Sequence, residues 1–194
     1  GNATTSYNLS VGYRNQEGMT AKTSNERMTA LFTMKSEIAK GLMLNLNINA
    51  YNNTYNAPNG EPQSIDGMIG YAVRQGPIYA GQKSDGSFGY QDNYSSEAWL
   101  ASESFVQNVS RNISASGQLT WNTPVDGLSF IGKVGMNYWT KYDKAYRADT
   151  YFDESKTVGP ATLNVWTANN TYTTFEALAT YEKQIKNHTF KLLA

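Results

Sequence analysis

Residues 42–50 alternate between two kinds of side chain: each even position is apolar, and Asn45, Asn47 and Asn49 occupy odd positions. Successive side chains of a β-strand point to opposite faces, so this period of two predicts a strand with one apolar face and one amide face. A helix would scatter both sets around its axis. The pattern leaves the environment open, because a soluble sheet turns its apolar face to a core, whereas a membrane barrel turns it to lipid.

The same alternation recurs along the chain and predicts roughly seven strands. The other apolar sets lie at residues 7–13, 28–34, 113–121, 128–138 and 175–181, and a last strand is expected to begin near His188. All five prolines fall outside these segments, as we expect because proline lacks the backbone N–H that a sheet needs. The sequence therefore predicts an all-β protein with antiparallel strands.

The composition argues against several classes of function. The 16 basic and 16 acidic residues give a net charge of +0, which offers no electrostatic basis for binding nucleic acid. The chain has no cysteine, which excludes a thiolate metal site, and its single histidine, His188, argues against a catalytic triad or a histidine zinc site. The acidic loop 143–154 lacks the ligand spacing and the glycine turn of a calcium loop. We therefore expect no enzymatic activity, no cofactor and no bound metal.

The connections between the predicted strands differ in length. Short ones at about 38–41, 123–127 and 183–187 alternate with long ones at about 54–108 and 143–168, so the long ones are expected together at one end of the sheet. Outer-membrane barrels have this asymmetry, with short periplasmic turns and long extracellular loops. A mean hydropathy of -0.55 agrees with a barrel, because transmembrane strands of about 9–11 alternating residues give a weak hydropathy signal. We therefore predict a transmembrane up-and-down β-barrel.

The distribution of charge assigns an environment to each face. Within the best-defined strands no charged residue interrupts the apolar face, and a lysine or arginine there would cost about 2–4 kcal/mol in lipid. Residues expected to contact lipid are Phe32, Leu44, Leu46, Leu119, Phe130 and Val134. Residues expected to face the barrel lumen are Asn45, Asn47, Asn49, Ser116, Gln118, Lys133 and Asn137. Aromatic girdles are predicted from Tyr13, Tyr51 and Tyr138 on the loop side and from Trp121 and Tyr181 on the turn side.

Four stretches of the chain carry a resemblance to a known family. They are "GNATTSYNLSVGYRNQEGM", "ERMTALFTMKSEIAKGLMLNLNINA", "SGQLTWNTPVDGLSFIGKVGMNY" and "TYEKQIKNHTFKLLA". Together, and in this order, they resemble the SusC/RagA family of TonB-dependent outer-membrane transporters. The first is the most specific, because "TTSYNLSVGYRNQEG" is similar to a strand-and-loop signature of the family. The resemblance spans nearly the whole chain and is weakest in residues 60–108 and 143–168.

The resemblance implies a plugged barrel on the order of 22 strands, of which residues 1–194 would form one part of the wall. The plug, the TonB-contacting segment and the signal peptide would lie outside this chain. Such a protein of the Gram-negative bacterial outer membrane imports oligosaccharides or peptides, with a SusD-like surface lipoprotein as lid and the TonB complex as energy source. Two alternatives stay open: a passive porin, and a soluble β-sheet protein that binds carbohydrate or has a structural role.

The longest predicted loop carries aromatic residues among Gly, Asn and Asp, a mixture that suits stacking on sugar rings or holding a peptide. The candidate substrate-binding residues are Tyr71, Tyr79, Phe88, Tyr90 and Trp99. The alternative is that these rings pack on one another, since a long ordered loop must bury aromatic side chains of its own. With loop 143–168, this loop is expected to form the surface that meets the lid or the substrate.

Overall fold

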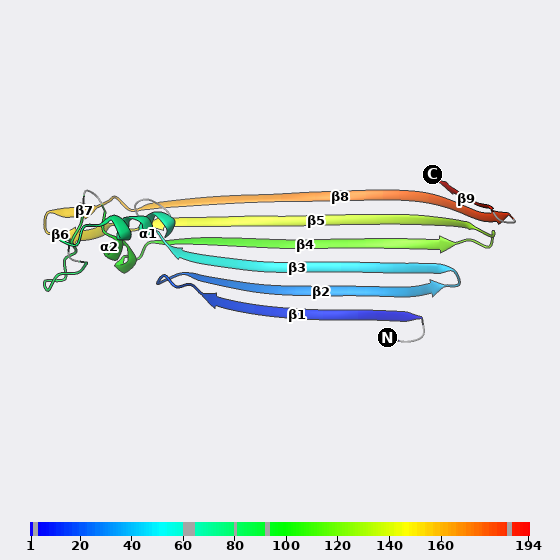
Figure 1. Cartoon of the computed structure of the whole chain (residues 1–194), viewed down its shortest axis with the longest axis horizontal. Coiled ribbons are helices and arrows are strands. Elements are labelled where there is room, and N and C mark those ends of the chain that lie inside the picture. Colours follow the sequence, from blue (N-terminus) through cyan, green and yellow to red (C-terminus); the bar gives the residue numbers. More distant parts are fainter. Residues whose placement is uncertain (2–3, 60–64, 80, 92–93, 186–187) are drawn as a thin grey trace.

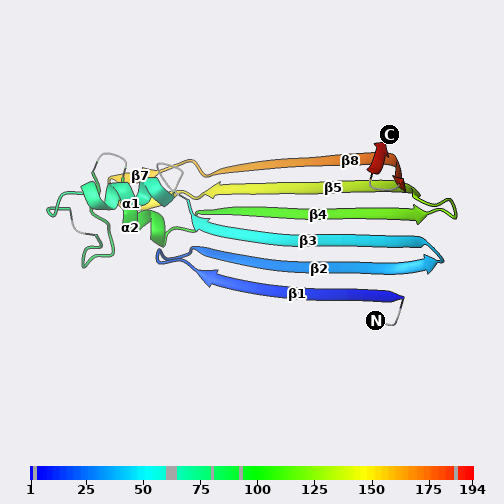
Figure 2. The ribbon, with the colours of Figure 1, turned by 45° about the vertical axis from the view of Figure 1, so that its right-hand side comes forward.

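The computed structural model describes residues 1, 4–59, 65–79, 81–91, 94–185 and 188–194. These residues form one long antiparallel sheet with a smaller group of loops, helices and short strands at one end (Figure 1). The short turns at 40–41 and 123–127 lie at the opposite end of the sheet, whereas the connection at 18–23 lies at the same end as the long loops (Figure 2). The two long connections are therefore together at one end of the sheet, as expected.

Seven strands form the main sheet in the order in which they occur in the chain, and each pairs antiparallel with its neighbours. They are β1 (Thr5–Glu17), β2 (Ser24–Ala39), β3 (Leu42–Pro58), β4 (Phe105–Asn122), β5 (Leu128–Arg147), β8 (Thr162–Ile185) and β9 (His188–Leu193). The all-β class and the number of strands in the main sheet are confirmed. Among the described strands, β1 and β9 each pair on one side only, so the sheet is open rather than a closed barrel.

The strands extend beyond the alternating segments that predicted them. β5 has 20 residues and β8 has 24, and the connections comprise residues 59–104 and 148–161. The expected loops 54–108 and 143–168 were therefore too long, because in the added residues apolar side chains such as Leu163 and Val165 alternate only briefly and are mixed with amide and charged side chains. The prediction that every proline lies outside a strand is wrong for Pro58, which is the last residue of β3. At a strand end the missing N–H interrupts no inner part of the ladder.

Two of the short turns each depend on one glycine. Gly41 and Gly127 have φ angles of 75° and 82°, in the left-handed region that glycine adopts without steric cost. Each glycine oxygen also accepts a backbone hydrogen bond of 2.8 Å, from Asn122 N to Gly41 and from Glu182 N to Gly127. A Cβ at Gly127 would collide with the backbone of Glu182. Both turns are thus held tightly against the neighbouring strand.

The two long connections pack together as a loop unit, which we define as residues 59–104 and 148–161. It contains α1 (Ile65–Arg74), α2 (Ser96–Ala101), and a hairpin of β6 (Thr150–Asp153) and β7 (Lys156–Val158). None of these four elements was predicted from the sequence. α2, β6 and β7 are too short to give a recognisable period, whereas α1 carries apolar residues at helical spacing, at positions 65, 68, 69, 72 and 73, which the search for strands missed.

The loop unit has a hydrophobic core of its own. Trp99 of α2 and Phe152 of β6 are fully buried, and their rings meet edge to face with centroids 6.0 Å apart. The backbone N–H of Phe88 donates to the Phe152 oxygen at 2.8 Å, which joins the two connections a second time. At the strand ends, Asn59 Nδ2 donates to the Tyr146 oxygen at 2.9 Å. The long connections are therefore a folded unit anchored to the sheet.

Adjacent residues of β6 offer a matched test of this core. Phe152→Ala removes a fully buried ring and is expected to cost the loop unit about 3–5 kcal/mol of local unfolding free energy. Tyr151→Ala removes a ring that is 49% exposed and should cost much less. Amide hydrogen exchange of α2 and β6 measures both effects. Equal loss of protection in the two variants would contradict the assigned core.

Candidate functional site

The hydrogen-bonded register brings the apolar side chains of neighbouring strands into rows on one face. Leu46, for example, lies directly opposite Met34 of β2 and Gly117 of β4, and directly paired residues of antiparallel strands share a face. Five successive rows contain no charged residue. From the turn side to the loop side, they contain Ala39, Leu42, Trp121, Phe130 and Ala179; Thr5, Ser36, Leu44, Leu119, Gly132 and Ala177; Tyr7, Met34, Leu46, Gly117, Val134 and Phe175; Leu9, Phe32, Ile48, Ala115, Met136 and Thr173; and Val11, Ala30, Ala50, Ile113, Tyr138 and Thr171. We call these rows the apolar band.

The apolar band is uncovered. Among the described residues, no helix or second sheet lies over it, and the loop unit sits at the end of the strands rather than over a face (Figures 1 and 2). Val134 is 45% exposed and Phe175 is 78% exposed. A β-sandwich would bury such side chains against a facing sheet about 10 Å away. The face predicted to contact lipid therefore has no protein core against it in the described part of the chain.

A charged residue marks the loop-side edge of the apolar band. Arg111 lies one row beyond Ile113 on the same face, and its Nε donates to Asn52 Oδ1 at 3.0 Å. Of the predicted girdle residues, four lie on this face near the two edges of the band: Tyr13, Tyr138, Trp121 and Tyr181. The Trp121 ring stacks on Phe130 with centroids 5.9 Å apart.

The girdle assignment of Tyr51 is wrong. Tyr51 pairs with Thr29 and Asn112, which places it on the opposite face, with Asn47 and Asn49. Position 51 is odd, and in β3 the odd positions belong to the amide face, so the period of two already excluded it from the apolar face. Its place near the loop end alone had suggested a girdle.

The opposite face of the sheet, which we call the polar face, collects the residues predicted to face a lumen. The register aligns Asn45 with Gln118, and Asn47 with Ser116, and brings all seven predicted residues to this face: Asn45, Asn47, Asn49, Ser116, Gln118, Lys133 and Asn137. A shallow hollow on this face is lined by Asn45, Asn47, Ser116, Gln118, Lys133 and Thr174. Their shared facing is confirmed, whereas their contact with a lumen stays a prediction.

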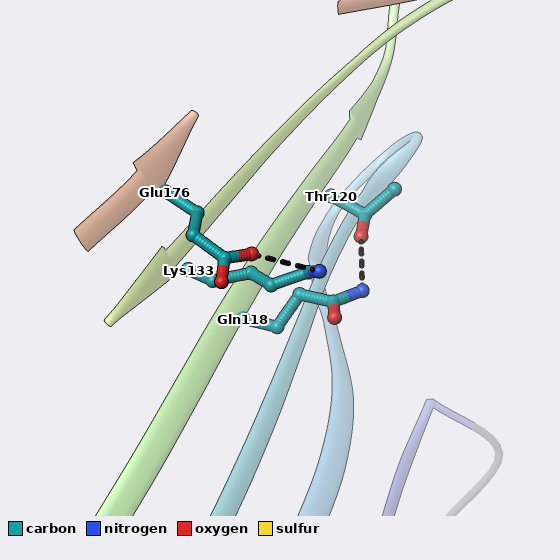
Figure 3. A network of polar contacts seen from close by, with 4 residues as sticks. All are labelled: Gln118, Thr120, Lys133 and Glu176. Carbon is teal, nitrogen blue, oxygen red and sulfur yellow. Dashed lines mark hydrogen bonds and ion pairs between the residues drawn. The ribbon is translucent and has the colours of Figure 1, made fainter. Parts of the chain in front are cut away.

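Polar contacts on this face run across and along the strands (Figure 3). Lys133 Nζ lies 3.1 Å from Glu176 Oε2, directly across from β5 to β8. Gln118 Nε2 donates to Thr120 Oγ1 at 3.1 Å along β4. These contacts hold long polar side chains close to the sheet.

The turn-side end of the polar face departs from the predicted pattern. Met43, Ile131 and Leu178 lie there in one row, separated by Thr120. The alternation was counted on the apolar face, so these three residues on the other face were missed. Met43 lies two residues from Asn45 and Ile131 two residues from Lys133, so the period of two could have placed both on the polar face.

The loop-side part of the polar face carries aromatic and cationic side chains. Tyr51 and Trp139 lie in one row on either side of Asn112. The guanidinium carbon of Arg27 lies 4.6 Å from the Tyr51 ring centroid, and Lys141 Nζ lies 5.2 Å from that of Trp166. Lys141 also pairs with Asp143 Oδ2 at 3.0 Å.

The loop aromatic residues proposed as substrate contacts are only partly available. Trp99 is fully buried in the loop core, so its ring offers no surface to a ligand. Phe88 and Tyr90 are half-buried against the same core, and the Tyr90 ring lies 5.4 Å from Phe152. Tyr79 is half-buried outside this cluster, and the side chain of Tyr71 lies outside the described part of the structure. Packing of loop on loop accounts for the position of Trp99.

Two aspartates of the loop unit shape tight turns. Asp85 Oδ1 accepts from Ser87 N at 2.9 Å and from Ser87 Oγ at 2.7 Å, and Asp153 makes the same two contacts with Ser155. The serine hydroxyl in each turn lowers the pKa of the aspartate. Because the pKa is lower in the folded turn than in the unfolded chain, the turn is stabilised at pH values above the unfolded pKa of the aspartate. This stabilisation is lost as the pH falls through the folded pKa.

Across the described residues, no group of three or more His, Cys, Asp or Glu side chains is placed to hold a metal ion. Within the same part of the chain, none of the helices combines the length and the apolar character needed to cross a membrane. No protein-family model matches the chain, and a search of curated proteins found no significant match.

The ion pair between Lys133 and Glu176 tests the environment of the polar face. Its side chains are 41% and 56% exposed, so a double-mutant cycle with Lys133→Gln and Glu176→Gln should give a coupling of about 0.2–1 kcal/mol that weakens with added salt. The free energy of unfolding of the four proteins measures it. A salt-independent coupling well above this range would mean that the pair is shielded from water.

Proposed function

We propose that this chain is part of the wall of a transmembrane β-barrel of the SusC/RagA type, which imports nutrients across the bacterial outer membrane. The observation that carries the proposal is the uncovered apolar band, because a sheet with a broad, charge-free and exposed apolar face requires an apolar environment on that side. The polar face then borders the lumen. The chain contributes to transport and performs no catalysis.

The height of the apolar band fits a bilayer. From Leu42 to Ala50, in the first and last rows of the band, the chain advances eight residues, or about 27 Å at roughly 3.4 Å per residue. Strands of outer-membrane barrels tilt by about 35–45°, which reduces this length to a height of about 21 Å between the two outermost rows. The apolar belt of such barrels is about 25 Å tall. Beyond the row of Arg111 the strands would continue out of the membrane on the loop side.

The open edges of the sheet support a larger barrel. Unpaired backbone groups cannot face lipid, because each would cost several kcal/mol, so β1 and β9 would pair with further strands. The asymmetry of the connections supports the orientation, with the short turns in the periplasm and the loop unit outside the cell. The loop unit would then meet a SusD-like lipoprotein lid and the incoming substrate, an oligosaccharide or a peptide. The TonB complex would act through other parts of the protein.

Two neighbouring positions of β3 test which face meets lipid. Leu46→Arg would place a guanidinium in the middle of the apolar band and should cost about 2–4 kcal/mol of barrel stability. Asn47→Arg would place the same group on the polar face, next to Ser116, where water or polar groups can solvate it. The heat stability of both variants in detergent, together with their yield in the outer membrane, measures the difference.

The two substitutions introduce the same chemistry one residue apart, so each serves as the control of the other. Equal losses of stability, or a greater loss for Asn47→Arg, would contradict the assignment of the faces. A protein that stays folded and monomeric in buffer without detergent would favour the soluble β-sheet alternative.

A further inference from the structure

We propose that the loop-side part of the polar face binds an oligosaccharide that carries carboxylate groups. This inference rests on the proposed function, in which the polar face borders the lumen, and it adds the chemical class of the ligand. The residues that carry it are Arg14, Arg27, Tyr51, Trp139 and Tyr172, from strands β1, β2, β3, β5 and β8 of the sheet.

Three cations lie in one row of this surface. Arg14 of β1 is directly opposite Arg27 of β2, and the same row continues through β3 and β4 to Lys141 of β5. In the rows next to it on this face, the described strands contribute one acidic residue, Asp143, which pairs with Lys141. The surface therefore carries an excess of positive charge, although the whole chain has a net charge of +0.

The arrangement of Arg14 and Arg27 disfavours the sheet itself. Like charges directly opposite one another on neighbouring strands destabilise the pairing. Arg14 donates to Asn25 Oδ1 at 3.2 Å and Arg27 lies over the Tyr51 ring, but within the described structure neither guanidinium forms an ion pair with an acidic side chain. An anion between the two groups would relieve the repulsion, and the planar guanidinium fork matches a carboxylate.

Aromatic rings and amides surround the cations. Tyr51 and Trp139 are two strands apart, which corresponds to roughly 10 Å at the usual spacing of about 4.8 Å between strands. Tyr172, which is 67% exposed, lies one row away on β8. Between them, Asn112 Nδ2 donates to Asn137 Oδ1 at 2.9 Å. Aromatic faces stack on sugar rings, and amides exchange hydrogen bonds with sugar hydroxyls.

The sheet geometry favours a sugar over an acidic peptide. Peptides that bind a sheet through their backbone add a strand at an open edge. β2, β3, β4 and β5 are paired on both sides, so their backbone groups are already used within the sheet. A ligand on this face must bind through side chains, and the side chains available are rings, amides and cations.

The test compares an acidic with a neutral sugar, and compares loss of the two arginines with loss of a lysine elsewhere on the same face. The protein is produced in the outer membrane and purified in detergent, and calorimetry measures binding of a galacturonic acid hexamer and of a neutral galactose oligomer of equal length. The unmodified protein should bind the acidic probe more tightly. The double variant Arg14→Gln/Arg27→Gln should lose about tenfold or more of this affinity, because each lost contact is a charge-assisted hydrogen bond. Lys35→Gln, which removes a cation from the turn-side part of the same face, should retain the affinity.

Further measurements separate the possible failures. Trp139→Leu should weaken binding of both sugars, because stacking does not depend on charge. Absent or equal binding of the two sugars, equal losses in the arginine and Lys35 variants, or equal binding of a glutamate hexapeptide would each overturn the carboxylate-sugar assignment. Assembly in the outer membrane is scored separately by protease protection and heat stability, so an assembled protein without acidic-sugar binding contradicts this inference alone. A protein that does not assemble in the membrane contradicts the proposed function.

Discussion

Hydrogen-bonded register between antiparallel strands determines which side chains share a face, and the arrangement of both faces depends on it. Because side chains alternate with a period of two, a slip of one residue in any pair would move that strand's apolar side chains to the polar face. In this sheet the register keeps Met34, Leu46, Gly117, Val134 and Phe175 in a single row. The tight turns at Gly41 and Gly127 help to hold it, because each is hydrogen-bonded to the neighbouring strand.

The chain combines two kinds of stabilisation. The loop unit has a small core of its own, in which Trp99 and Phe152 are removed from water. The sheet has no such core among the described residues, and its strands are held to one another by ladders and cross-strand contacts such as that between Lys133 and Glu176. A sheet of this kind gains little hydrophobic stabilisation in water, because its apolar side chains stay exposed. We infer that its stability depends on the medium against the apolar band.

The sequence predicted the sheet well and the loops poorly, for physical reasons. Alternation at 42–50 identified both faces of β3, and the same rule found the other main strands. Beyond the row of Arg111, charged and amide side chains such as Lys144 and Asn56 interrupt the apolar positions of that face, so the ends of β5 and β8 gave only a short periodic signal. The short elements of the loop unit depend on long-range contacts, such as that of Trp99 with Phe152, which no local pattern records. Counting alternate positions from Asn47 and from Lys133 could have assigned Tyr51 and Trp139 to the polar face. That the two residues lie near one another depends on the order of the strands, which the sequence pattern does not reveal.

Contact of the apolar band with lipid is tested most directly by the accessibility of each position along β3 in a lipid bilayer. Because the 194-residue chain has no cysteine, single cysteines at positions 42–50 can carry a spin label without background from this chain. Electron paramagnetic resonance then compares collisions with oxygen, which concentrates in lipid, and with a water-soluble nickel complex. Contact of the apolar band with lipid predicts high oxygen accessibility at every even position and low oxygen accessibility at every odd one. A uniform profile, or the opposite alternation, would contradict the assignment of the apolar band to lipid.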